Sequence, residues 1–383
     1  MKVASYLAVF AGAFSLFGCV STELDTYGGS AVGDNIATSS RQESTESATP
    51  LFPSMVPERL LVGMSTNTAD PLCRLDYYDE LQVYKMSRFA RIDEAEIEHA
   101  VSRHFTGLGI AALEDDGARA QLKRDLLQQA RASSFLPLHP DLAVSRTITP
   151  VMVAYAHNRQ AFAATEQAEI ENWFTNIIDA VERSELQRSL PRYHNIRYRQ
   201  AVNQAILGVI GSDGGRLNDA INVYKSAIDN GMREDGSFRN DSERGGNAVS
   251  KQAGATGHLV VLAEIMANQG IDLYSYGGDK TIEDAVTFSV SAYANPAIIY
   301  PYARLGGIED GFSARAPRMT FFQNPGGEWT FYWAERFLQS PATALIKEHV
   351  DYYIRKQGPN PDVNAYWDHN DLAGGSAACF TRQ

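Results

Sequence analysis

The chain has 383 residues, and its 46 acidic residues outnumber its 34 Lys and Arg residues, so the formal net charge is −12. This balance argues against nucleic acid as a partner, because proteins bind phosphate backbones through basic surfaces. It does not by itself favour an anionic substrate. A local cationic cleft is still compatible with the composition, since the stretch from Arg192 to Lys251 is rich in basic residues.

The first residues predict export. Residues 1–18 combine a positive charge at Lys2 with a short apolar run, which is typical of a signal peptide and too short for a membrane span. The ending LFGC resembles a bacterial lipobox and predicts a lipidated Cys19. An ordinary cleaved signal is the alternative, because Phe17 is bulky for that motif. We therefore expect an exported bacterial lipoprotein, periplasmic or anchored in the outer membrane, that touches the membrane only through its lipid.

A polar segment precedes the folded part. Residues 19–57 begin at the lipidated cysteine and are rich in Ser, Thr, Gly and Glu without an apolar period, so we predict a disordered tether. Residues 58–383 then form one large domain, although length alone would allow two. In an exported protein, Cys73 and Cys379 suggest a disulfide, with two buried thiols as the alternative. Neither cysteine has the spacing of a zinc site, and we expect no metal or cofactor.

Apolar residues recur at helical spacing through the domain, and no alternating β pattern of any length is present. Thr165 is a predicted N-cap, and Asn230-Gly231 is a predicted left-handed helix end. Successive helical hairpins are typical of α-solenoids and α/α toroids. We predict an all-α chain that forms an (α/α) toroid or incomplete barrel of helical hairpins. The clearest predicted helices span residues 165–184, 198–211, 216–231 and 249–268.

Three segments resemble those of the bacterial alginate (mannuronate-specific) lyases. The stretch DGSFRNDSERGG contains Arg244 and leads into a predicted helix. In that family the corresponding segment leads into the helix that carries the catalytic Tyr. The stretch HNIRYRQ places Asn195 and Tyr198 on the family's Asn-His-x-Tyr helix. The stretch SRFARID (residues 87–93) is similar to the family's Ser-Lys-Tyr-x-x-x-Asp loop and places Arg88 on the substrate-binding Lys. The resemblance implies a toroid fold and β-elimination of an anionic polysaccharide.

The departures from the family pattern concern its acid and base. Lys251 stands where the family has its catalytic Tyr, seven residues after Arg244, and Gln252 stands where an aromatic residue or His is usual. Ile196 replaces the family's His, although His194 lies on the other side of Asn195. The resemblance therefore implies that the carboxylate-binding groups are retained while the proton-transfer groups are changed.

The chemistry of such a lyase assigns roles to these residues. Removal of the C5 proton of a uronate requires that its carboxylate be neutralised, which suits the Arg244 guanidinium and the Asn195 amide. Lys251 can act as the base if burial beside cations lowers its pKa from about 10.4. Otherwise Lys251 is an acid or a second carboxylate clamp. The alternative bases are Tyr198, Tyr193 and His194.

The predicted partner is an anionic polysaccharide such as alginate, mannuronan or a glucuronan-like polymer, and we expect a monomer. The main alternative is a non-catalytic glycan-binding lipoprotein on a lyase scaffold. A glycoside hydrolase would need two carboxylates facing one cleft. The predicted substrate-binding residues are Arg88, Arg197, Arg199 and Gln252. The candidate carboxylates of a hydrolase are Asp235, Asp241 and Glu243.

Overall fold

The structure is a computed structural model that describes residues 55–61, 94–135, 142–303, 333–334 and 336–348. The chain divides into the units Met1–Ala48 and Thr49–Gln383, and every described residue belongs to the second. Within these ranges no helix is both long and apolar enough to cross a membrane. The predictions for the signal peptide and for four residues lie outside the described residues. These residues are Cys19, Cys73, Arg88 and Cys379.

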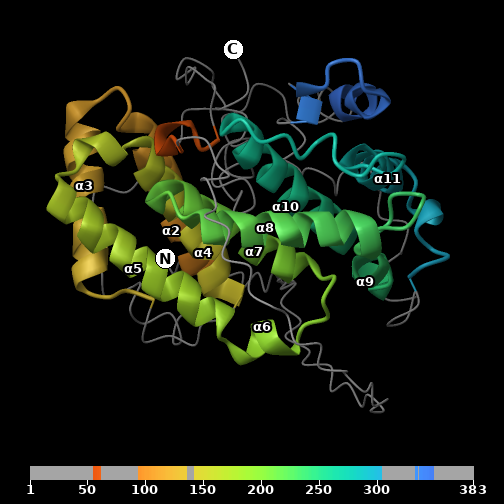
Figure 1. Ribbon diagram of the computed structural model, residues 1–383, viewed down its shortest axis with the longest axis horizontal. Helices are drawn as coiled ribbons and strands as arrows, with labels where there is room; N and C mark the ends of the chain where they lie inside the picture. The colour runs from red at the N-terminus through yellow and green to blue at the C-terminus, as the bar shows by residue number, and fades with distance from the viewer. Residues whose placement is uncertain (1–54, 62–93, 136–141, 304–332, 335, 349–383) are drawn as a thin grey trace, which may run out of the picture. The chain divides into compact units, whose positions relative to one another are not determined.

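The described part of the chain is helical, and its one β feature is an isolated bridge between Met232 and Phe238. The predicted all-α class is therefore confirmed. The helices, labelled in Figure 1, are α2 (Glu94–Ala111), α3 (Asp116–Arg131), α4 (Leu142–His157), α5 (Ala164–Glu182), α6 (Glu185–Ser189), α7 (Asn195–Gly211), α8 (Gly214–Ser226), α9 (Arg239–Ser242), α10 (Ala248–Asn268) and α11 (Ile282–Ala294).

The helices pack as successive hairpins. α2 packs against α4, α4 against α7, and α7 against α10, so these four helices follow one another through the domain. A second helix packs on most of them: α3 on α2, α5 and α8 on α7, and α11 on α10. This pairing of helices is the arrangement predicted for a toroid of helical hairpins.

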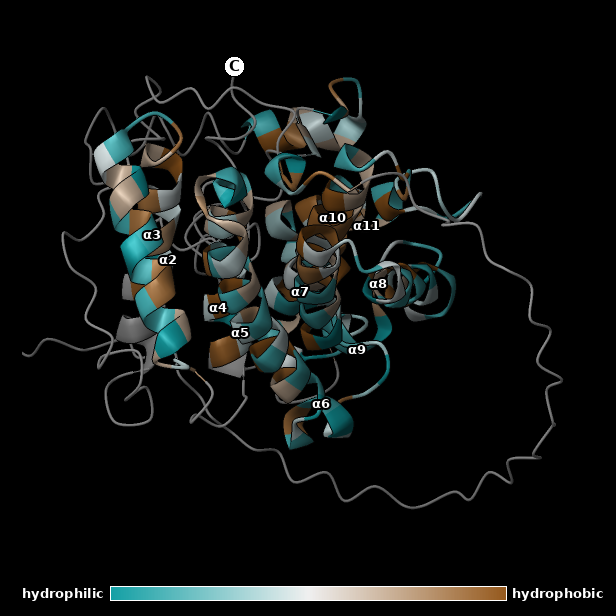
Figure 2. Ribbon diagram, turned by 60° about the vertical axis from the view of Figure 1, so that its left-hand side comes forward, coloured by the Kyte–Doolittle hydropathy of each residue, from teal (hydrophilic) through white to brown (hydrophobic). Residues whose placement is uncertain are grey.

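Burial explains why α10 is central. Its residues from Gln252 to Met266 are almost all buried, and Figure 2 shows it as strongly hydrophobic, whereas α3 and α8 carry hydrophilic outer faces. A helix that is apolar all round must be enclosed by others. The polar residues near its start, Lys251 and Gln252, therefore need a specific reason to be there.

The start of α5 differs from its prediction. Thr165 lies inside the first turn, because the helix begins at Ala164. The Glu166 carboxylate accepts a hydrogen bond from the Ala163 backbone N–H at 2.8 Å, so an acidic side chain satisfies this end in place of the predicted threonine cap.

Gly231 also differs from its prediction as a left-handed helix end. After α8 the chain makes a π-helical turn over Ala227–Gly231, and Gly231 is not among the positive-φ glycines. A Cβ at this position would lie 3.0 Å from the hydroxyl oxygen of Tyr198 and 3.2 Å from the ring of Tyr193. The glycine therefore allows the close approach of two tyrosines.

Candidate active site

The candidate site lies where the first turns of α7 and α10 meet. The amide nitrogen of Asn195 lies 3.5 Å from the position of a Cβ on Gly254, one helical turn after Lys251. α4 and α9 contribute as well, since α4 packs on α7 and α9 on α10. We call the resulting group the Lys251 cluster. It comprises Arg146, His194, Asn195, Arg199, Asp241, Arg244 and Lys251.

His194 joins α7 to Arg244. The imidazole is buried, and its Nδ1 accepts a hydrogen bond from the Ile196 backbone N–H at 3.2 Å, which caps the helix. Its Nε2 lies 2.9 Å from Nη1 of Arg244. Burial, together with the charges of Arg244, Lys251 and Arg197, lowers the pKa of His194 to about 4, so the ring is neutral at neutral pH.

This neutral ring has more donors around it than it can accept. A neutral imidazole carries one N–H and one acceptor nitrogen. If Nδ1 accepts from Ile196, Nε2 carries the proton and faces the Arg244 guanidinium, which can only donate. If Nε2 accepts from Arg244, the ring N–H faces the Ile196 N–H instead. In either tautomer two donors are opposed at the His194 ring.

Lys251 is half-buried, and within the residues that the structure describes its ammonium has no hydrogen-bond or ion-pair partner. Burial lowers its pKa most, and repulsion from Arg146, Arg244 and Arg199 lowers it further, while Asp241 acts in the opposite direction. An amine without a counter-ion, placed among guanidinium groups, is the environment that favours the neutral form.

Within the part of the chain that the structure describes, Asp241 is the carboxyl group whose charge acts on Lys251. It is fully buried, its Oδ1 accepts from the Asn195 backbone N–H at 3.3 Å, and its Oδ2 has no partner among the described residues. Burial raises its pKa to about 7, against the lowering effects of the Asn195 N–H, Arg244 and Lys251. The sequence motifs do not predict that Asp241 acts on Lys251. They indicate Asp241 only as a candidate carboxylate of a hydrolase.

The other two candidate hydrolase carboxylates are engaged elsewhere. Asp235 accepts a hydrogen bond from the Tyr302 hydroxyl at 2.6 Å, and Glu243 pairs with Arg233 at 2.5 Å. Asp241 therefore has no second carboxylate facing it among these candidates, and the pair that a glycosidase needs is not formed.

Tyr198 lies beneath the site. The ring is buried and packs on Phe238, and its hydroxyl has no hydrogen-bond partner among the residues that the structure describes. Burial, with the nearby Asp241 carboxyl, raises its pKa well above the usual value, so the phenolate form is disfavoured. Tyr198 is for this reason less suited than Lys251 to act as the base.

Gln252 is completely buried beside Lys251. Its Oε1 accepts from the Phe238 backbone N–H at 2.7 Å, and its Nε2 donates to the Gly236 carbonyl at 3.2 Å and the Ser289 hydroxyl at 3.3 Å. The amide thus fastens the loop before α9 to α10 and α11. We therefore assign Gln252 to the support of the site and leave it out of the substrate-binding set.

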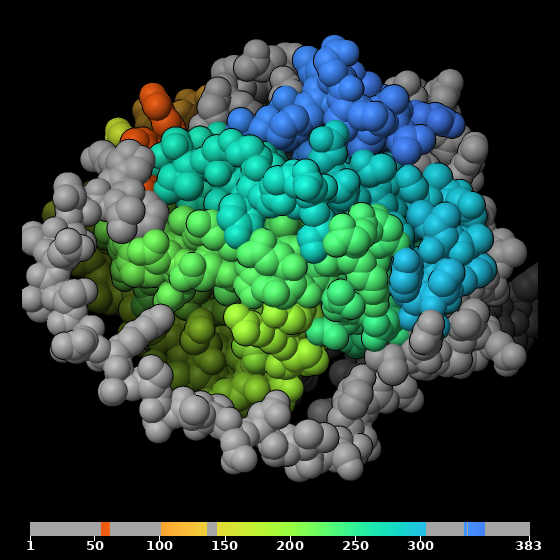
Figure 3. Space-filling model, turned by 45° about the vertical axis from the view of Figure 1, so that its right-hand side comes forward, coloured from red at the N-terminus to blue at the C-terminus, as the bar shows by residue number. Residues whose placement is uncertain are grey.

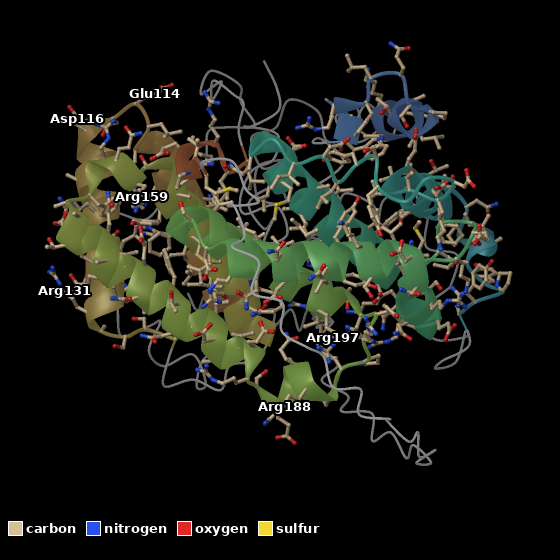
Figure 4. All side chains as sticks on the ribbon, viewed as in Figure 1. Glu114, Asp116, Arg131, Arg159, Arg188 and Arg197 are labelled. Atoms are coloured by element: carbon tan, nitrogen blue, oxygen red, sulfur yellow. The ribbon has the colours of Figure 1, made fainter. Side chains whose placement is uncertain are left out.

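The predicted arginines separate into two groups. Arg199 is buried in the cluster, where its charge acts on Lys251. Arg197, labelled in Figure 4, lies in the first turn of α7 and donates instead to the carbonyls of Leu190 (2.7 Å) and Pro191 (2.9 Å). Sequence motifs miss Arg146 altogether, because only the packing of α4 against α7 brings it to the site.

No group of residues suited to holding a metal ion occurs in the described ranges. The cluster contains guanidinium, amine, imidazole and amide groups with a single carboxyl. Such a set can bind an anion and exchange a proton, whereas metal ions in proteins prefer several carboxylates, imidazoles or thiolates.

Comparisons with known proteins match the segment that contains the cluster to a known family. The family model "Alginate lyase" matches residues 130–299, which include every member of the Lys251 cluster. A search of the curated proteins finds no match.

Solved structures show the same fold at low sequence identity. A tyrosine-to-phenylalanine variant of alginate lyase A1-III, complexed with a tetrasaccharide, is 19% identical, with a TM-score of 0.60 over 88% of this chain and 99% of that chain. Alginate lyase A1-III from Sphingomonas species A1 is 18% identical, with a TM-score of 0.58 over 86% and 90%. An alginate lyase from Bacteroides ovatus is 14% identical, with a TM-score of 0.50 over 79% and 86%. The family match over residues 130–299 agrees with the resemblance predicted from the motifs, and the fold shared with the solved structures confirms the predicted (α/α) toroid.

Proposed function

We propose that the protein is a polysaccharide lyase that cleaves a uronic acid-containing anionic polysaccharide, such as alginate, mannuronan or a glucuronan-like polymer, by β-elimination. The family match and the fold support a polysaccharide lyase. The observation that carries the proposal is the excess of donors around His194 and Arg244. The carboxylate of a bound uronate provides the acceptor that this arrangement lacks.

The carboxylate must be neutralised before the C5 proton can leave, because that proton is weakly acidic while the carboxylate keeps its full charge. The Arg244 guanidinium offers a planar pair of donors that matches a carboxylate. The Asn195 side chain makes no hydrogen bond within the described part of the chain, so its amide is available as a second donor. Both groups stabilise the enolate-like intermediate as its charge develops.

Lys251 acts as the base in this proposal. Its neutral amine takes the C5 proton, the C4–C5 double bond forms, and the bond from C4 to the glycosidic oxygen breaks. The leaving oxygen needs a proton, and the ammonium just formed on Lys251 carries one. The three neighbouring guanidinium groups favour its release, because they lower the pKa of Lys251.

A substrate panel tests the proposal. The protein is incubated with alginate, glucuronan and glycosaminoglycans, and the ultraviolet absorbance of the unsaturated uronate is followed, since only elimination creates that chromophore. We expect absorbance to rise with at least one polymer, and Arg244→Ala to abolish the rise without changing the melting temperature. New reducing ends without absorbance would indicate a hydrolase. Binding without any product would indicate the non-catalytic glycan-binding protein.

We also propose that the chain is a monomeric bacterial lipoprotein, held in the periplasm or at the outer membrane through Cys19. The support is the LFGC ending of the apolar N-terminal run. Labelling cells with a radioactive fatty acid should mark the parent protein and not Cys19→Ser, which should move from the membrane to the soluble fraction. An unlabelled parent protein would indicate an ordinary cleaved signal peptide without a lipid on Cys19.

A further inference from the structure

The loop of residues 233–244 begins and ends on an arginine, and we call it the arginine loop. The guanidinium of Arg233 reaches back to the far end of this loop. Its Nη1 donates to the hydroxyls of Ser237 at 3.1 Å and Ser242 at 2.8 Å, and its Nη2 pairs with the carboxylate of Glu243 at 2.5 Å. Glu243 directly precedes the second arginine, so the first arginine holds the backbone from which the second extends.

The chemistry of the guanidinium suits this task. A planar guanidinium can direct one nitrogen to two hydroxyls and the other to a carboxylate, whereas an ammonium is a compact point charge. Hydrogen bonds from a charged donor are also stronger than neutral ones. The side chain of Arg233 is only 18% exposed, so water weakens these contacts less than it weakens a surface ion pair.

Tyr302 covers the face of the Arg233 guanidinium. The centre of its ring lies 4.5 Å from Cζ of Arg233, and its hydroxyl donates to Asp235 at 2.6 Å. Tyr302 also packs on Phe288 of α11, in a small apolar cluster that includes Ala248 at the start of α10. In Figure 3 the arginine loop (green) accordingly adjoins the segment that follows α11 (light blue). The loop is thus anchored to the part of the molecule from which α10 starts.

Two side chains hold different parts of the arginine loop. Gln252 is bonded to its middle, and Arg233 is bonded to its end. The end is the part that leads to the Lys251 cluster, where Nη1 of Arg244 lies 2.9 Å from Nε2 of His194. Such a contact is lost when the loop moves by about 1 Å, because hydrogen bonds weaken steeply with distance.

We propose that Arg233 is a positioning residue that holds Arg244 where its guanidinium can bind the uronate carboxylate. Arg233 acts through Ser242 and Glu243, which it fixes directly before Arg244. The proposal rests on the proposed function, since that function assigns Arg244 to the carboxylate. The link between the two arginines can nevertheless be measured without a substrate.

The His194 ring reports the position of Arg244. Burial and the charges of Arg244, Lys251 and Arg197 lower the pKa of His194 to about 4, and Arg233 is not one of these charges. If Arg233→Ala allows Arg244 to move away from the ring, the pKa of His194 should rise toward its ordinary value. NMR of protein labelled with ¹⁵N-histidine measures the titration, and a His194→Gln protein assigns the signal.

Three further proteins calibrate the change. Arg244→Ala gives the full rise that loss of this charge can cause, and we expect Arg233→Ala to reach at least half of it. Arg233→Lys, which keeps the charge without the fork, should give a smaller rise. Arg239→Ala is the matched control, because Arg239 is an exposed arginine of α9 in the same loop, and it should leave the pKa of His194 unchanged.

The double variant Arg233→Ala, Arg244→Ala separates positioning from a general loosening of the site. If Arg233 acts through Arg244, the double variant should show the same pKa of His194 as Arg244→Ala alone. A further rise would mean that Arg233 maintains the burial of His194, and this result would overturn the proposal. An unchanged pKa in Arg233→Ala alone would overturn it as well.

Turnover then tests the consequence for catalysis. On a polymer that the parent cleaves, Arg233→Ala should lower kcat by about 10- to 100-fold, since a displacement of about 1 Å can cost that much, and Arg239→Ala should keep the parental value. A parental kcat in Arg233→Ala would overturn the proposal. If the parent cleaves no uronate polymer, the proposed function fails, and the titration of His194 still decides whether Arg233 holds Arg244 in place.

Discussion

At Lys251, burial and repulsion from guanidinium groups act in the same direction, and both lower the pKa of the amine. If Lys251 is the base, kcat should rise with pH as the amine deprotonates. Lys251→Arg keeps the positive charge but cannot release its proton at such pH values. We expect this variant to lose a factor of about 10²–10⁴ in kcat, the usual contribution of a general base.

Two outcomes would assign Lys251 another role. Turnover close to that of the parent in Lys251→Arg would make the lysine a cationic clamp, and the base would have to be sought at Tyr193, Tyr198 or His194. Parental turnover in Lys251→Ala as well would remove the residue from the mechanism and strengthen the glycan-binding alternative.

Asp241 predicts a pH-dependent stability. Its pKa is about 7 in the folded protein, against an ordinary value of 3.8, so between these values the folded state keeps a proton that the unfolded state has lost. Folding stability therefore falls as the pH rises from about 4 to about 7. Asp241→Asn removes this titration and can still accept the Asn195 N–H.

The measurement is the melting temperature of the parent and of Asp241→Asn across this pH range. The melting temperature of Asp241→Asn relative to the parent should rise with pH. The corresponding difference in the free energy of unfolding should grow by an amount on the order of 4 kcal/mol, since one pKa unit corresponds to about 1.4 kcal/mol. A difference that does not vary with pH would mean that the carboxyl of Asp241 titrates normally in the folded protein.

At the scale of elements, Gln252 connects the loop before α9 to α10 and α11. Gln252→Met keeps the length of the side chain but leaves the buried Phe238 N–H without an acceptor. We expect a loss of about 1–3 kcal/mol in the free energy of unfolding, measured with urea. Lys251→Met is the matched control, because the ammonium of Lys251 has no partner in the described residues, so its stability should not fall.

The same pair of variants separates support from substrate binding. Below its melting transition, Gln252→Met should keep the KM of the parent, since the amide is fully buried. A raised KM with unchanged stability would return Gln252 to the substrate-binding set.

The helices themselves could be predicted well. The apolar periods of α7, α8 and α10 are visible in the sequence, and α7 and α10 end at the predicted Gly211 and Asn268. Of the two helix ends that were predicted wrongly, the start of α5 depends on the local contact between Ala163 and Glu166, whereas Gly231 depends on distant residues. Gly231 reads as a helix cap in isolation, but its missing side chain makes room for Tyr198 and Tyr193.

For the whole molecule, we predict that Cys73 and Cys379 form a disulfide that ties the C-terminal tail to the start of the domain. Both lie outside the described residues, and the prediction rests on their isolation in a chain that we predict to be exported. A non-reducing peptide map should find the two cysteines in one linked fragment, and reduction should lower the free energy of unfolding by about 2–5 kcal/mol. Two free thiols in the map would contradict the bond.

The described part of the chain shares its fold with solved alginate lyases at 14–19% identity, and the motif resemblance implies that Lys251 and Ile196 replace the family's Tyr and His. A fold of this kind depends on apolar periodicity and packing, which many sequences satisfy. Activity depends on particular groups, which we propose are Lys251 and Arg244 in this chain, so a shared fold does not by itself determine the reaction. The substrate therefore has to be identified with the substrate panel.

The sequence by itself determined the helical class and the resemblance to alginate lyases, because these follow from local periodicity and short motifs. Through that resemblance it also singled out Arg244, Asn195 and Lys251. Only the tertiary structure decided which groups surround Lys251 and which side chains support the site. Arg146 lies more than 100 residues from Lys251 in the chain and reaches it only through helix packing, and the burial that shifts a pKa is likewise a property of the folded chain.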